Sequence, residues 1–183
     1  IPGGEADPMA TEQAFYALVA LQRAEEGKPS LYNMTQTNNN SQGEGSQKEF
    51  TCSISISCNT IFDNMDKLGQ AKKAFVPEDG WILKETTVSF EQGESVHDVL
   101  KRVCMDKKIH MESSYTPMYE SAYVEGIGQL YEFDCGELSG WMYKVNGLFP
   151  NYGCAAYLVN DGDAIVWMYT CDLGMDVGDN STW

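Results

Sequence analysis

The sequence predicts an α+β protein in which a β sheet is combined with one main helix, and a separate helix lies near the N-terminus. Residues 141–145 alternate between apolar and polar or flexible side chains, which indicates a strand with one apolar face. Residues 164–171 are apolar on both faces, as is typical of a strand in the middle of a sheet. Residues 95–108 carry apolar side chains at helical spacing, which predicts the main helix.

Two short turns bound the last strands. Asn146-Gly147 follows the first of them, and this dipeptide tolerates the positive φ angles that a tight hairpin turn needs. Asp161-Gly162 precedes the strand at 164–171 as a second turn. We therefore expect a compact hairpin region that the rest of the chain covers and flanks.

The N-terminal part of the chain reads differently. Residues 8–26 predict a helix with a wide apolar face, which Gly27 and Pro29 end. Residues 35–48, TQTNNNSQGEGSQK, contain nothing that can be buried and predict a flexible linker. The predicted organisation is a helical segment over 1–34, a linker over 35–48 and a β domain over 49–178.

Further elements of the β domain follow in order. Residues 50–58 predict the first strand, with the serine face nearer water, and residues 60–75 predict one or two helical turns. A second strand is expected within 81–90. In the main helix Ser95 and Asp98 can form a capping box, and we also expect Asp98 to pair with Arg102 one turn further on. From residue 109 onward several short strands are expected, and the acidic tail after Cys171 is expected to be solvated.

Composition excludes several classes of partner. The chain has 183 residues, a net charge of −15 and no basic run. Nucleic acids and anionic membranes are bound through clusters of Lys and Arg, so neither is expected as a partner. No apolar run approaches the roughly 20 residues of a membrane-spanning helix. We therefore expect no membrane insertion.

The six cysteines indicate an oxidising, extracellular setting, although buried free thiols remain the alternative. Cys52 and Cys58 cannot pair within one strand, because six residues span about 20 Å. Cys135 and Cys154 flank the hairpin strands, which favours a bond between them. The disulfide candidates are Cys52, Cys58, Cys104, Cys135, Cys154 and Cys171.

Little in the sequence points to catalysis or to a metal. No CxxC pair is present, and the only histidines are His97 and His110, so a zinc site is not expected. A Cys104–His97 dyad is unfavourable because seven helical residues separate the two side chains by about 10 Å. His97 is expected to face solvent. We expect the protein not to be an enzyme.

Aromatic residues gather near the hairpin. Because side chains alternate between the two faces of a strand, about half of these aromatic residues are expected in the core of the sheet. Phe149 and Tyr152 differ, because they fall on a turn between strands, where aromatic side chains can form the rim of a binding site.

At this point a family resemblance can be stated. GWMYKVNG and YGCAAYLVNDGDAIVWMYTCDLG resemble the C-terminal β domain of transcobalamin and intrinsic factor, and CSISISC and FPNYGC add a closer likeness to bacterial relatives of unassigned function. The resemblance covers about 50–175. It implies a β-grasp-like mixed sheet that holds one main helix. It also implies that the first and last strands are neighbours, which would favour a disulfide between Cys52 or Cys58 and Cys171.

The N-terminal helix, ATEQAFYALVALQRAEEGKPSLYNM, resembles the final helix of a prenyltransferase or squalene-cyclase repeat, an α/α toroid. In the cobalamin carriers the toroid precedes the β domain and the ligand lies between the two. The resemblance therefore implies that 1–34 is the end of a truncated toroid and that the chain holds half of a ligand site. The partner of the β domain would then be the upstream toroid.

Two functions follow from different classes. The first is a secreted or cell-surface ligand-binding module for cobalamin or a similar small molecule, with no other cofactor indicated. Its contact residues would be Trp141, Tyr143, Phe149, Tyr152 and Tyr157. The second is an adhesion or spacer module of a bacterial cell-surface protein, which binds no small molecule and uses these aromatic side chains for core or interface packing.

Overall fold

The computed structural model describes residues 49–116 and 121–179, which include nearly all of the predicted β domain. The predicted helix at 8–26, its assignment to a toroid and the predicted linker lie outside the described residues. The α+β class is confirmed for the part of the chain that the structure describes, where a mixed sheet is combined with one main helix. Within this part no helix is long and apolar enough to cross a membrane.

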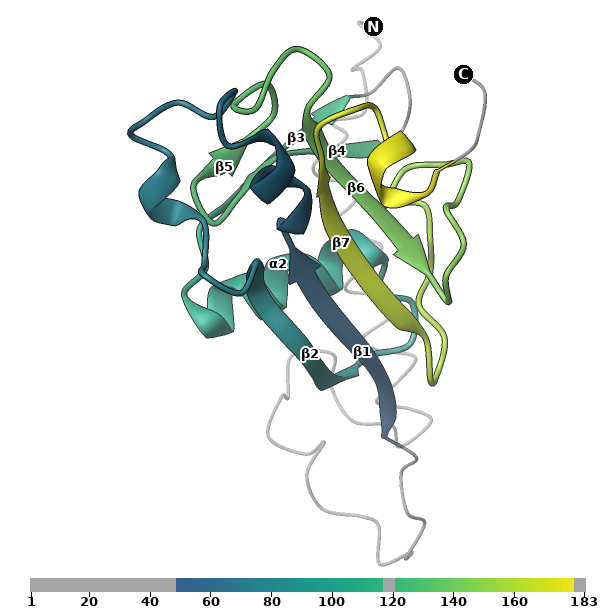
Figure 1. The fold of residues 1–183 in the computed structure, drawn as a ribbon. Coiled ribbons are helices and arrows are strands. Elements are labelled where there is room, and N and C mark those ends of the chain that lie inside the picture. Colours follow the sequence, from purple (N-terminus) through teal and green to yellow (C-terminus); the bar gives the residue numbers. More distant parts are fainter. Residues whose placement is uncertain (1–48, 117–120, 180–183) are drawn as a thin grey trace, which may run out of the picture. The chain divides into compact units, whose positions relative to one another are not determined.

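A four-stranded sheet forms the centre of the domain. It contains β1 (Phe50–Ser57), β2 (Trp81–Phe90), β6 (Gly140–Val145) and β7 (Ala164–Thr170) in the order β2-β1-β7-β6. β1 and β7 are parallel neighbours, whereas the two outer pairs are antiparallel, so the sheet is mixed (Figure 1). The predicted interior position of the last strand is thus confirmed, and so is its position beside the first strand.

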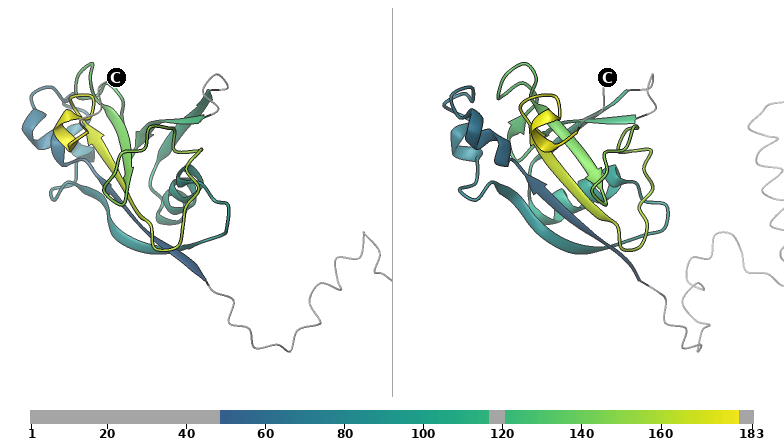
Figure 2. Two further views of the ribbon diagram at one scale, coloured as in Figure 1. Left: turned by 90° about the vertical axis from the view of Figure 1, so that its right-hand side faces the viewer. Right: turned by 45° about the vertical axis from the view of Figure 1, so that its right-hand side comes forward.

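The main helix, α2 (Val96–Lys107), packs on one face of this sheet (Figure 2). Its buried side chains are Val96, Val99, Leu100, Val103 and Cys104. The predicted capping box is present, because Ser95 and Asp98 each accept a hydrogen bond from the other's main-chain N–H. The strand, strand, helix, strand, strand order with parallel first and last strands is the β-grasp arrangement that the resemblance implied.

The predicted pairing of Asp98 with Arg102 is wrong. The Asp98 carboxylate is engaged by Ser95 in the cap, at 3.0 Å from the main-chain nitrogen and 2.6 Å from the hydroxyl. Arg102 instead lies 3.0 Å from Glu94 and also donates to the carbonyl of Ser89. The Asp98 carboxylate therefore belongs to the helix cap, although the i,i+4 spacing predicted that it would pair with Arg102.

A second sheet departs from the single sheet that the sequence suggested. It consists of β3 (Met111–Thr116), β4 (Ser121–Ile127) and β5 (Leu130–Tyr131), in that order. The β3–β4 register shifts between Glu112 and Ser113, which lie opposite Gly126 and Val124, so the pairing is irregular near Gly126. These strands are inserted between α2 and β6, and β4 comes to lie beside β6 (Figure 1).

Short 3-10 helices complete the domain. Two of them, η2 (Asn59–Asn64) and η3 (Lys73–Phe75), account for the helical turns expected at 60–75. The third, η5 (Met175–Val177), lies in the tail. The predicted solvated tail is confirmed at Asp172 and Asp176, which are exposed, and is wrong at Asp179, which is only 6% exposed. Asp176 also accepts a 2.7 Å hydrogen bond from the main-chain N–H of Cys171.

The serine face of β1 is also less exposed than expected. Ser55 and Ser57 are buried, although Ser53 is only partly covered. β1 lies between two strands, and Ser57 is aligned with Trp81 on one side and Met168 on the other. Larger neighbours of this kind shield a small side chain from water even on the more polar face of a sheet.

All six cysteines are buried and none is bonded to another. The predicted Cys135–Cys154 pair is not brought together, because the thiol of Cys135 donates to the carbonyl of Asn64 and that of Cys154 to the carbonyl of Ala122.

The predicted bond from the first strand to Cys171 is not formed either. The parallel register aligns Ser57 with Met168, so Cys58 and Cys171 are offset by about two residues, on the order of 7 Å. Cys52 lies near the opposite end of β1.

Candidate functional site

A groove of about 860 Å³ lies where β4 and β6 come together. Most of its lining comes from β4, β6, the segment 133–139 and the segment 149–156, and the rest comes from β7 and from Leu173 and Asp179 in the tail. β6 is the outer strand of the four-stranded sheet, and β4 belongs to the inserted sheet, so the groove forms where the two sheets meet. Seven aromatic side chains line it: Tyr123, Phe133, Trp141, Tyr143, Phe149, Tyr152 and Trp167.

Strand β6 positions two of these aromatic side chains against the neighbouring strand. Trp141 is aligned with Tyr169 and their rings meet edge to face at 5.2 Å. Tyr143 is aligned with Trp167, with ring centroids 5.4 Å apart. Cross-strand aromatic pairs of this kind stabilise an antiparallel sheet, so one face of β6 and β7 forms a rigid floor.

The segment 149–156 is tied to both sides of the groove. The Tyr143 hydroxyl donates to the carbonyl of Tyr152 at 2.8 Å, which joins the segment to β6. On the other side the Cys154 thiol donates to the carbonyl of Ala122 at 3.5 Å, which joins it to β4. The Tyr152 ring stacks on Tyr157, with centroids 6.0 Å apart and planes 18° apart, and is itself 53% exposed. The segment therefore presents Tyr152 at the rim in a fixed orientation.

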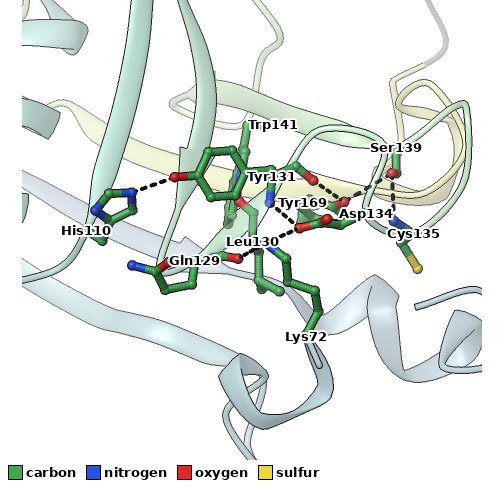
Figure 3. A network of polar contacts seen from close by, with 10 residues as sticks. All are labelled: Lys72, His110, Gln129, Leu130, Tyr131, Asp134, Cys135, Ser139, Trp141 and Tyr169. Atoms are coloured by element: carbon green, nitrogen blue, oxygen red, sulfur yellow. Dashed lines mark hydrogen bonds and ion pairs between the residues drawn. The ribbon is translucent and has the colours of Figure 1, made fainter. Parts of the chain in front are cut away.

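The segment 133–139 is held from behind by the network in Figure 3. The Tyr169 hydroxyl lies 2.7 Å from the carbonyl of Tyr131, just before the segment, and 3.0 Å from the hydroxyl of Ser139 at its end, so one buried side chain holds the chain on both sides of the turn. The Trp141 indole donates to the carbonyl of Leu130 at 2.9 Å. Lys72 forms an ion pair with Asp134 at 3.0 Å. These contacts fix the wall that carries Phe133 and Leu138 to the groove.

The structure places four of the five predicted contact residues on the groove. Tyr143, Phe149 and Tyr152 are partly exposed there, whereas Trp141 is mostly buried and contributes only part of its surface. Tyr157 does not line the groove and supports Tyr152 from behind.

Sequence reasoning missed other groove residues. Tyr123 lies on the first half of β4, and nothing local showed that this strand would lie beside β6. Phe133 has a positive φ of 65°, a conformation that no motif in its neighbourhood predicts. Trp167 lies in the segment 164–171, whose apolar character on both faces predicted an interior strand and not a groove.

Trp167 has one unusual property. Its side chain is 2% exposed, and its indole Nε1 has no hydrogen-bond partner among the described residues. A buried donor without a partner costs about 1–3 kcal/mol, so such groups are uncommon. Trp167 lines the groove, which makes a bound acceptor one way to satisfy this donor.

The groove has no positive charge. Its ionisable carboxylic acids are Glu137 and Asp179, and no Lys, Arg or His is among the lining residues. Burial raises the pKa of Tyr143, and burial together with the hydrogen bond to Glu132 raises the pKa of Tyr123 to about 12. The phenols therefore remain protonated at neutral pH, and the groove suits a ligand that is neutral or cationic rather than anionic.

The histidines are engaged away from the groove. His97 Nε2 lies 2.9 Å from the hydroxyl of Ser113, so this side chain is half-buried rather than solvent-facing as predicted. His110 Nε2 lies 2.6 Å from the hydroxyl of Tyr131. In the described part of the chain no cluster of three or more His, Cys, Asp or Glu side chains could hold a metal ion.

One known family matches the second half of this domain. A family described as a domain of unknown function (DUF4430) matches residues 93–171, which run from just before α2 to the end of β7. No curated protein matches the chain.

Two solved structures are similar in fold. One is haptocorrin in complex with Cbi, with 14% sequence identity and a TM-score of 0.48; the match covers 70% of this chain and 27% of the haptocorrin chain. The other is a supposed metal binding protein from Ruminococcus gnavus ATCC 29149, with 15% identity and a TM-score of 0.40, covering 67% of this chain and 97% of that chain. The present chain thus spans less than a third of the haptocorrin chain.

Proposed function

We propose that the β domain binds a small molecule in the groove between β4 and β6. The observation that carries the proposal is the groove of about 860 Å³, walled by seven aromatic side chains and held open by rigid contacts on each side. Sites for small molecules are typically concave and largely apolar, with few polar groups to fix orientation. The hydroxyl of Ser121 is such a group here, and Trp167, whose indole Nε1 has no partner among the described residues, also lines the groove.

The lining defines the chemistry of the ligand. Stacking on Tyr152 and Phe149 favours a ligand with a flat or apolar face. The acidic lining and the chain's net charge of −15 disfavour an anion. Cobalamin is the first compound to test, because the amino-acid sequence of the hairpin resembles that of the β domain of cobalamin carriers. In this proposal the protein acts outside the cell, secreted or on the cell surface, and binds without catalysing a reaction.

Isothermal titration calorimetry with hydroxocobalamin on the 183-residue chain tests the proposal, with amide chemical shifts to locate binding. We expect weak, saturable binding, because an open groove buries only part of a large ligand. Tyr152→Ala and Phe149→Ala should weaken it at least about tenfold, since each removes a stacking surface worth on the order of 1 kcal/mol or more. Tyr115→Ala is the matched control, because Tyr115 is exposed on β3 and does not line the groove.

A panel of neutral, cationic and anionic aromatic compounds extends the same experiment. Saturable binding of a neutral or cationic member with shifts confined to the groove supports the proposal even if cobalamin itself does not bind. If neither cobalamin nor any panel member perturbs groove amides at millimolar concentration, the groove is not a small-molecule site.

One observation favours the second candidate, an adhesion or spacer module. Exposed apolar side chains lie on the groove or close to it in sequence: Leu173 lines it, Leu148 directly precedes Phe149, and Met175 begins η5. Apolar residues exposed together are typical of protein interfaces. A module of this kind would bind no member of the compound panel. Leu148→Ser and Leu173→Ser would reduce its binding to a protein partner.

A further inference from the structure

Two cysteines that lie far apart in sequence meet behind the groove wall. Cys135 is in the turn after β5, and Cys171 directly follows β7. The main-chain N–H of Leu173 donates to the carbonyl of Leu138 at 3.0 Å, and Gly140 is aligned with Thr170 in the β6–β7 ladder. The backbone therefore holds the two cysteine-bearing segments side by side.

Both thiols also point at the same short helix. The Cys135 thiol donates to the carbonyl of Asn64 at 3.3 Å, and the Cys171 thiol lies 3.8 Å from the hydroxyl of Thr60. Thr60 and Asn64 belong to η2 and are joined by a 3.0 Å hydrogen bond. Two side chains from different segments thus converge on one turn of η2, which fixes both of them.

The ionisation of each thiol depends on the other. Burial raises the pKa of Cys135, and the neighbouring Cys171 thiol acts in the opposite direction. Burial also raises the pKa of Cys171 to about 12, and the Cys135 thiol adds to that rise. Such mutual effects arise between side chains that are near neighbours, in agreement with the backbone contacts and the shared position on η2.

The other four cysteines have different surroundings. Cys58 donates to the carbonyl of Gly80 and Cys154 to the carbonyl of Ala122, each at 3.5 Å. Burial is the main reason for the raised pKa values of Cys52 and Cys104. In the described residues none of these four thiols is hydrogen-bonded to another thiol.

We propose that Cys135 and Cys171 form a structural disulfide when the chain folds in the presence of a small-molecule disulfide as oxidant. The thiolate of one cysteine attacks the oxidant and releases one small thiol, which leaves a mixed disulfide on the protein. The second cysteine then attacks the protein sulfur of that mixed disulfide and releases the second small thiol. Two electrons and two protons pass from the cysteine pair to the oxidant, which becomes two thiols.

The burial of both cysteines determines when during folding the disulfide can form. Cys135 is fully buried and Cys171 is 6% exposed, so neither sulfur is open to an oxidant in the folded domain. Exchange therefore occurs before the segment 133–139 packs, and the finished bond is shielded from reductants afterwards. The bond would join the segment that carries Phe133 and Leu138 to the segment that carries Leu173, and so reinforce one wall of the groove.

The test is a disulfide map of the whole chain. The reduced, unfolded protein is refolded in a mixture of oxidised and reduced glutathione, unfolded again with an excess of iodoacetamide to block every free thiol, and digested without reduction. Mass spectrometry should find one cross-linked peptide pair, containing Cys135 and Cys171, that is lighter by two hydrogens than the two free peptides together. The other four cysteines should be alkylated.

Stability provides a second readout. Closing this loop restricts the unfolded chain, so the oxidised protein should melt at least about 5 °C above the reduced protein. Cys135→Ser and Cys171→Ser should each abolish the cross-link and the difference between the two redox states. Cys104→Ala is the matched control, because it removes a buried thiol outside the pair and should retain both.

The wild-type map decides the question even if a cysteine variant does not fold. Full alkylation of all six cysteines after oxidative refolding would overturn the proposal. So would a predominant bond between any other two, such as Cys135 and Cys154. Ligand titration is not part of this test, so its result is independent of whether the groove binds a small molecule.

Discussion

The Tyr143 hydroxyl donates a hydrogen bond to the main-chain carbonyl of Tyr152 at 2.8 Å. This bond connects the outer strand of the central sheet to the loop that forms the rim of the groove. Tyr143 is partly buried, and burial raises its pKa, so the hydroxyl remains a donor at physiological pH. The orientation of Tyr152 therefore depends on a side chain that the sheet itself holds in place.

We predict that Tyr143→Phe loosens the rim without disturbing the sheet. The variant keeps the ring that packs on Trp167 and loses only the hydroxyl, which should cost about 1 kcal/mol. Amide hydrogen exchange in the segment 149–156 should become faster, whereas exchange in β7 should be unchanged. Tyr115→Phe, which alters an exposed hydroxyl on β3, should have no effect. Unchanged exchange at 149–156 in Tyr143→Phe would show that the bond does not hold the rim.

A second prediction concerns the contact between the rim and β4. A Cβ atom at Gly153 would lie 1.5 Å from Ser121 Oγ and 2.5 Å from Ser121 Cβ. Gly153→Ala should therefore push the loop away from β4 and destabilise the protein by about 1–3 kcal/mol in chemical denaturation. Gly69→Ala is the control, since nothing lies within 4 Å of a Cβ at that position.

The double variant distinguishes steric from backbone effects. Ser121→Gly removes both atoms that a Cβ at residue 153 would meet, so Ser121→Gly combined with Gly153→Ala should cost less than the sum of the two single changes. If the effects are instead simply additive, the contact with Ser121 is not the cause of the destabilisation.

The elements that the sequence predicted well are those fixed by local chemistry. The capping box of Ser95 and Asp98 and the turn at Asn146-Gly147 each depend on residues within a few positions of one another. Asn146 and Gly147 have φ values of 52° and 81°, as this dipeptide tolerates. Alternation likewise identified β6, and apolar character on both faces identified β7 as an interior strand.

The groove depends on contacts that no local pattern encodes. It exists because the inserted sheet brings β4 beside β6, and because Tyr169 holds the segment 133–139 through Ser139. The same limit explains the error over the cysteines. Cys135 was paired with Cys154 because both flank the hairpin in sequence, whereas the turn at 133–139 carries Cys135 to η2 and Cys171.

The pH dependence of stability provides a third prediction. Burial lowers the pKa of His97 below its ordinary value of 6.5, and the charge of Lys101 acts in the same direction. The folded protein then binds this proton less readily than the unfolded chain. The stability associated with neutral His97 is present above about pH 6.5 and is lost as the pH falls through the folded pKa.

Denaturant unfolding at a series of pH values between 7.5 and 5 measures this effect. The free energy of unfolding should decrease across the window in the wild type, and the decrease should be smaller in His97→Gln. Asp79→Asn is the control: the hydrogen bond from Lys84 lowers the pKa of Asp79 below its ordinary 3.8, so its own titration falls outside the window. An equal slope in His97→Gln and the wild type would assign the pH dependence to other groups.

The last prediction concerns the turn that sets the register of the hairpin. Asn146 Nδ2 donates to Asp163 Oδ1 at 2.8 Å, and Asn146 Oδ1 accepts from the main-chain N–H of Ala164 at 2.9 Å. Asp163 is buried, so Asn146→Ala leaves a buried carboxylate with one donor fewer and also places an alanine at a φ of 52°. We expect a loss of about 2–4 kcal/mol in the free energy of unfolding, from both effects together.

Asn146→Gly separates these two contributions. Glycine removes the same side-chain hydrogen bonds but adopts positive φ without strain, so Asn146→Gly should be less destabilising than Asn146→Ala by about 1 kcal/mol. If both variants lose the same stability, the side-chain bonds to Asp163 and Ala164 account for the whole effect. If Asn146→Gly is as stable as the wild type, the backbone conformation alone matters, and the bond to Asp163 contributes nothing to the hairpin.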